Sequence, residues 1–84
     1  MTMRFAIRSD VAITVAFEPT AEIYPLSAGE EIAVEWTDGA DDGAVTLEAG
    51  DMVVHVPSGG SRMRAWRSDG SEIYIGPDSG PEAM

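Results

Sequence analysis

The chain has 84 residues, a formal net charge of −10 and no cysteine, so disulfides and thiolate chemistry are excluded. All five of its basic residues are arginines. Nucleic acids and anionic membranes bind cationic surfaces, so this charge predicts a protein with no nucleic-acid partner and no membrane partner. The first residues contain Arg4 and no apolar run long enough for a signal peptide, so we expect a cytoplasmic protein.

The acidity has two interpretations. One is solubility, or the composition of a high-GC or salt-adapted genome. The other is an acidic surface that attracts a basic partner or imitates a nucleic acid.

Alternation of apolar and polar residues with a period of two runs through almost the whole chain, as is typical of strands with one buried face. The turns between these runs are rich in Gly, Pro, Asp and Ser, and Asp69-Gly70 predicts a tight β-hairpin. No run has helical spacing. In chain order, the strand candidates are residues 4–8, 11–18, 21–26, 30–37, 44–48, 51–57, 62–68 and 71–76, of which the first and third are the weakest.

Seven or eight short strands predict an all-β fold, namely a small antiparallel β-sandwich or a jelly-roll-like half-barrel with mainly sequential strand order. A single β domain is expected over residues 1–76, followed by a coil tail at 77–84. The apolar positions of the strands give an expected core of Phe5, Ile7, Val11, Ile13, Val15, Phe17, Ile32, Val34, Trp36, Val45, Leu47, Met52, Val54, Val56, Met63, Ile73 and Ile75.

Two loops invite comparison with ligand-binding motifs. Residues 38–43, DGADDG, match part of the EF-hand calcium loop, but Ala40 and Ala49 stand where ligands are required. Residues 57–62, PSGGSR, offer a glycine turn beside Arg62 that can form an anion nest, but they lack the lysine of a P-loop. We interpret both segments as turns.

The stretch AGDMVVHVPSG, residues 49–59, resembles the second half-motif of cupins, and YPLSAGEEIAVEW, residues 24–36, is similar to the lead-in of such jelly-roll domains. The likeness covers about half the chain. Gly50 and Pro57 are one residue too far apart for the motif, and Arg62 stands where the metal-binding histidine of the family would follow. The resemblance therefore implies a small cupin-like β fold without the metal chemistry.

His55 is the only histidine, and it alternates with Val54 and Val56 in its strand. It therefore points away from the apolar face, and we interpret it as a surface or hydrogen-bonded structural residue rather than a metal ligand or a base. Nucleophilic catalysis and zinc binding need partners that a single histidine lacks. We predict no catalytic residue, no metal, no cofactor and no enzymatic activity.

The candidate binding residues are Arg62, Arg64 and Trp66 on one face of a strand, extended by Tyr74 of the adjoining hairpin strand. Tryptophan and arginine dominate the energetics of protein interfaces. The alternative is that these arginines pair with glutamates of a neighbouring strand, Glu31 and Glu35, and stack on the indole ring.

These features predict a small non-enzymatic binding or protein-interaction module, with a protein partner or as a homodimer formed through an edge strand or an exposed apolar face. A degenerate cupin-like protein that binds a metal or small ligand around His55 is the second class of function. An acidic inhibitor or nucleic-acid mimic of a basic partner is the third.

Overall fold

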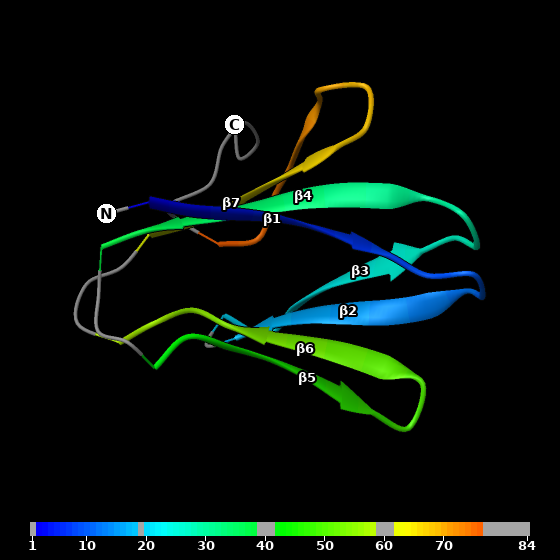
Figure 1. Cartoon of the computed structure of the whole chain (residues 1–84), viewed down its shortest axis with the longest axis horizontal. Coiled ribbons are helices and arrows are strands. Elements are labelled where there is room, and N and C mark those ends of the chain that lie inside the picture. The colour runs from blue at the N-terminus through cyan, green and yellow to red at the C-terminus, as the bar shows by residue number, and fades with distance from the viewer. Residues whose placement is uncertain (1, 19, 39–41, 59–61, 77–84) are drawn as a thin grey trace.

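A computed structural model describes residues 2–18, 20–38, 42–58 and 62–76, and this part of the chain forms eight strands in two layers (Figure 1). The result confirms the prediction of a small all-β sandwich. No helix among these residues is long and apolar enough to cross a membrane. The coil tail expected at 77–84 lies outside the described residues. The strands are β1 (Thr2–Arg8), β2 (Ile13–Glu18), β3 (Glu22–Leu26), β4 (Glu31–Thr37), β5 (Ala44–Glu48), β6 (Asp51–His55), β7 (Arg62–Arg67) and β8 (Glu72–Ile73).

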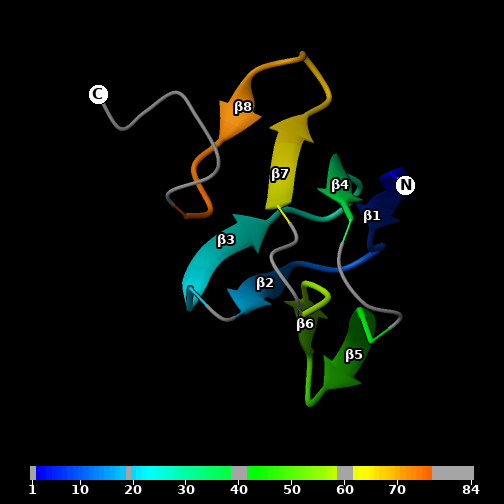
Figure 2. The same cartoon turned by 90° about the vertical axis from the view of Figure 1, so that its left-hand side faces the viewer.

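The two sheets have the strand orders β1-β4-β7-β8 and β3-β2-β6-β5. Figure 2 shows β3 and β8 at one edge of the sandwich and β1 and β5 at the other. The prediction of mainly sequential order is wrong for three pairs, because β1 pairs with β4, β4 with β7, and β2 with β6. The chain passes to the other sheet after β1, β3, β4 and β6, so most consecutive strands lie in different layers. The β2–β6 pair is parallel, and the other five pairs are antiparallel.

The core lies between the sheets, where the inward-facing residues of both layers meet. Five more apolar residues and Tyr24 are partly buried against it. Phe5 contacts Trp36 edge to face, with ring centroids 5.2 Å apart. The buried apolar residues are Ile7, Val15, Phe17, Leu26, Ile32, Val34, Val54, Met63, Ala65, Ile73 and Ile75.

Three residues of the expected core are exposed. Val11 lies in the bend before β2 and is 64% exposed. Val45 and Leu47 are 45% and 70% exposed on β5, which is an edge strand of its sheet. Two residues of the buried apolar core were not expected: Leu26, which follows a proline, and Ala65, which is small.

The hairpin predicted at Asp69-Gly70 is present between β7 and β8. The backbone N–H of Arg67 donates to the carbonyl of Ser71 at 2.8 Å, and that of Gly70 donates to the carbonyl of Arg67 at 3.0 Å. Gly70 has a φ of 91°, a conformation that favours glycine. The Asp69 carboxylate accepts hydrogen bonds from the hydroxyl and the backbone N–H of Ser71, which hold its pKa below the ordinary value.

Turn residues close the β3/β8 edge of the sandwich. The hydroxyl of Thr20, between β2 and β3, donates to the carbonyl of Ile75 at 2.8 Å. The Tyr24 hydroxyl donates to Glu30 of the β3–β4 turn, and the guanidinium carbon of Arg67 lies 5.4 Å from the centre of the Tyr24 ring. These contacts connect the two layers along this edge.

Candidate interaction face

Four of the five arginines share the outer face of the β1-β4-β7-β8 sheet. Arg4 and Arg8 lie on β1, and Arg62 and Arg64 lie on β7, all at positions that alternate with the buried residues of their strands. Trp66 of β7 has the same parity. We call Arg4, Arg8, Arg62, Arg64 and Trp66 the arginine face. The opposite side of this sheet packs against the core, so the second layer does not cover the arginine face.

The register explains how Trp66 is held. Trp66 lies opposite Ala33 of β4, and Ala33 lies opposite Ala6 of β1, so on this side of Trp66 its row of the sheet offers only methyl groups. The guanidinium carbon of Arg64 lies 5.1 Å from the centre of the indole ring, and that of Arg4 lies 4.7 Å from it. Strands β1 and β7 are about 10 Å apart with β4 between them, so Arg4 and Trp66 meet above the small Ala33. Half-buried Trp66 is thus fixed by two cation–π contacts.

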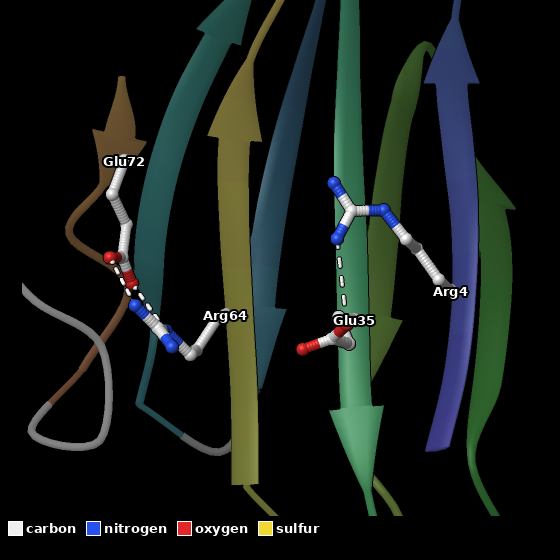
Figure 3. Close-up of polar contacts among 4 residues, drawn as sticks. All are labelled: Arg4, Glu35, Arg64 and Glu72. Atoms are coloured by element: carbon white, nitrogen blue, oxygen red, sulfur yellow. Dashed lines mark hydrogen bonds and ion pairs between the residues drawn. The ribbon is translucent and has the colours of Figure 1, made fainter. Parts of the chain in front are cut away.

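Each of the two arginines over the Trp66 ring also forms an ion pair, and Figure 3 shows these two pairs. Arg64 donates through Nε and Nη2 to both carboxylate oxygens of Glu72, at 2.8 and 2.7 Å. This bidentate hydrogen bond raises the pKa of Arg64 above its ordinary value. Arg4 of β1 reaches to Glu35 of the neighbouring strand β4, with 3.4 Å between Nη1 and Oε2.

Two shallow hollows flank this arrangement. One has a volume of about 540 Å³ and is lined in part by Arg4, Ala33, Trp66 and Arg67. The other, of about 400 Å³, is lined by Glu35, Thr37, Asp38, Arg62 and Arg64. The arginine face therefore combines an aromatic ring, oriented hydrogen-bond donors and two shallow hollows.

The structure places Arg62, Arg64 and Trp66 on one face of β7, and Tyr74 directly after β8. Arg62 and Arg64 are exposed and Trp66 is half-buried, while Tyr74 is 42% exposed between the buried Ile73 and Ile75. Arg64 stacks on the indole ring of Trp66, as the alternative of internal arginine contacts expected.

The ion pairing differs in part from that alternative. Arg64 binds Glu72 of the hairpin and Arg4 binds Glu35, but Glu35 also lies opposite Arg64 and contributes to its raised pKa. Sequence reasoning missed both Arg4 and Glu72. The register of the predicted hairpin could have identified Glu72, because this register places Glu72 opposite Trp66. The chain gave no comparable signal for Arg4, because strands β1 and β4 are far apart in the sequence.

The other sequence candidates lie elsewhere. His55 is exposed at the end of β6, opposite Glu18 of β2 and Ala44 of β5. Among the described residues, no group of three His, Asp or Glu side chains is arranged to hold a metal ion. Asp42 of the acidic loop accepts hydrogen bonds from the hydroxyl and backbone N–H of Ser58, which lower its pKa. The middle of that loop (39–41) and the glycine turn at 59–61 lie outside the described residues.

Comparisons of the chain with family models, curated proteins and solved structures gave no match. The functional argument therefore depends on the geometry of the arginine face.

Proposed function

We propose that this protein is a small cytoplasmic interaction module without catalytic activity, which binds a protein partner through the arginine face. The observation that carries the proposal is Trp66, held under two guanidiniums on a sheet face that the second layer does not cover. Tryptophan and arginine are the residues that most often dominate binding energy at protein interfaces.

The charge distribution supports the same surface. The arginine face carries four arginines beside three glutamates, Glu31, Glu35 and Glu72, whereas the whole chain has a net charge of −10. A surface that served only solubility would be acidic like the rest of the chain. The partner we expect covers the Trp66 ring and offers carboxylates or carbonyl oxygens to the arginines.

A binding role also suits the rest of the molecule better than an enzymatic one. His55 lies on the outer face of the other sheet, between Glu18 and Ala44 of the flanking strands, so neither neighbour is a nucleophile for it to activate. The absence of cysteine suits a reducing compartment such as the cytoplasm.

The test is a double variant, Arg64→Ala with Trp66→Ala, used as bait beside the wild type in partner capture and in titrations of the captured protein. Losing such a central tryptophan typically costs ~2 kcal/mol or more of binding free energy, which is a loss of about 30-fold in affinity. The matched control, Ile23→Ala with His55→Ala, changes two exposed residues of the other sheet. It should retain the partner.

Two results would contradict the proposal. A partner that binds the double variant as well as the wild type would show that the arginine face is structural. If high salt released that same partner, the acidic surface would be the binding site, as expected for an inhibitor or nucleic-acid mimic. Metal bound at about one equivalent and lost on His55→Ala would instead favour the ligand-binding, cupin-like alternative.

A further inference from the structure

The strand β5 is exposed along its whole length, although its alternation of apolar and polar residues is that of a strand with one buried face. All five of its residues are exposed. Val45 pairs with the fully buried Val54, and Leu47 pairs with the half-buried Met52, so both point to the core side of the sheet. They remain 45% and 70% exposed there. Met3 of β1, the facing edge strand in Figure 2, is 51% exposed.

The backbone edge of β5 also lacks the protection that the other edge strands carry. Edge strands avoid further pairing through charged side chains, proline or short length. Strand β1 has Arg4 and Arg8, β3 has Pro25, and β8 has only two residues. Strand β5 has five residues, without proline or a cation, and its only charge is Glu48 at the end.

We propose that β5 binds β5 of a second copy of this chain, antiparallel and centred on Thr46. The two β3-β2-β6-β5 sheets then form one continuous eight-stranded sheet around a two-fold axis. In this register Val45 of each copy lies opposite Leu47 of the other, so both apolar side chains face apolar partners. A shift by two residues in either direction places one of them opposite Gly43 or Ala49 instead.

The charges on β5 agree with this occupant. Glu48 lies opposite Ala44 of the other copy, and the two Glu48 side chains are four residues, or about 13 Å, apart. No acid therefore opposes an acid along the ladder. Each whole chain has a net charge of −10, so the two copies repel each other at long range, and salt should strengthen the association.

The size of the interface predicts a weak dimer. Two five-residue strands and the side chains beside them cover less than the roughly 800 Å² per partner of a standard interface. We therefore expect rapid exchange between monomer and dimer, with the dimer favoured in concentrated samples. The β5 edge belongs to the other sheet and lies away from the hollows beside Trp66. A variant can therefore abolish pairing through β5 without affecting binding at the arginine face, and the reverse.

The register can be tested by cysteine crosslinking because the chain has no cysteine of its own. Thr46→Cys places two thiols on directly opposed residues, whose Cα atoms are about 4.5 or 5.5 Å apart in an antiparallel pair, within disulfide reach. Ala44→Cys is the matched control, since it is exposed on the same strand and the same face but lies about 13 Å from its own copy. Mild oxidation should give mostly covalent dimer for Thr46→Cys and little for Ala44→Cys. Equal crosslinking of both variants, or of neither, would overturn the proposed pairing.

Sedimentation at increasing concentration tests the interface without a crosslink. Leu47→Lys should remain monomeric where the wild type dimerises, because it places a charge in the apolar pair. Ile23→Lys, which changes a residue 65% exposed on the other edge strand of the same sheet, should dimerise like the wild type. A wild type that stays monomeric at every concentration and in high salt would refute the proposal, as would loss of dimer in Ile23→Lys alone. Neither result concerns Trp66, so the arginine face would stand.

Discussion

The two edges of this sandwich differ in how far their inward-facing side chains are buried, although the strands of both edges alternate apolar and polar residues. At the β3/β8 edge, Leu26, Ile73 and Ile75 are at most 5% exposed. At the β1/β5 edge, Val45 and Leu47 are 45% and 70% exposed. The inward-facing pattern of a strand therefore does not by itself decide burial, which also requires something to lie over it.

The difference arises from the turns rather than from the strands. The β3/β8 edge is covered by the segment after β8, whose Ile75 carbonyl accepts a hydrogen bond from Thr20. Glu30 of the β3–β4 turn also accepts a hydrogen bond from Tyr24 of β3 at this edge. The inward-facing residues of β5, by contrast, are left exposed by the described part of the chain. A sheet edge of this kind is typical of proteins that bind a strand.

Two leucines on the two edges provide the largest expected contrast. Leu26→Ala should lower the free energy of unfolding by ~2–5 kcal/mol, because it leaves a cavity in the core. Leu47→Ala should change it by less than ~0.5 kcal/mol in dilute monomer, because the side chain is already exposed. Denaturant unfolding followed by tryptophan fluorescence measures both. Equal losses for the two variants would refute the difference between the edges.

Gly43, just before β5, sharpens the comparison because it is tightly packed. A Cβ at this position would lie 2.7 Å from the indole of Trp36 and 2.8 Å from the ring of Pro57, so at least one of these groups would have to shift. Gly43→Ala should therefore cost ~1–3 kcal/mol of stability. The penalty should shrink in a Trp36→Phe background, which makes room for the methyl group. A Gly43→Ala variant that unfolds like the wild type would show that the start of β5 packs loosely too.

The Thr20 hydroxyl tests whether polar contacts hold the closed edge. Thr20→Val keeps the shape of the side chain but removes the hydrogen bond to the Ile75 carbonyl, so we expect a loss of ~1 kcal/mol in unfolding free energy. Hydrogen exchange near Ile75 should quicken at the same time. Unchanged exchange there would mean that apolar packing alone closes this edge.

The Tyr24–Glu30 pair should give the smallest effect and a pH signature. The hydrogen bond from Tyr24 holds the pKa of Glu30 below its ordinary 4.5, so its contribution to stability is present above pH 4.5 and is lost as the pH falls through the lower folded-state value. Burial, followed by the bond to Glu30, raises the pKa of Tyr24 above 10, so that contribution is lost as the pH rises beyond 10. Tyr24→Phe should be slightly less stable than the wild type at pH 7, and the gap should narrow at both extremes. A gap that stays constant with pH would contradict the pairing.

The sequence predicted the all-β sandwich because alternation and turn residues are local signals. The positions of the eight strands follow from these signals, as does the hairpin at Asp69-Gly70. The pairing of β1 with β4 and the parallel pairing of β2 with β6 were not predictable, because they depend on which layer each connection enters. The exposure of Val45 and Leu47 was not predictable either, because it depends on which segments of the chain cover each edge of the sandwich.

For the arginine face, the sequence could group residues of one hairpin but not of distant strands. Alternation placed Arg64 and Trp66 on one face, and the hairpin added Tyr74. Arg4 could be assigned to this face only from the three-dimensional fold, because its contact with Trp66 crosses the intervening strand β4. Small residues opposite a tryptophan, here Ala33, are a sign of such a contact once the register is known.

Amide hydrogen exchange at low and at high protein concentration tests most directly whether β5, at the β1/β5 edge, pairs with β5 of a second copy. Residues 44–48 should exchange more slowly as concentration rises, since pairing would bury their outward-facing N–H groups, whereas residues 22–26 on the opposite edge should not change. Exchange at residues 44–48 that is independent of concentration, or slowing confined to residues 22–26, would contradict the account.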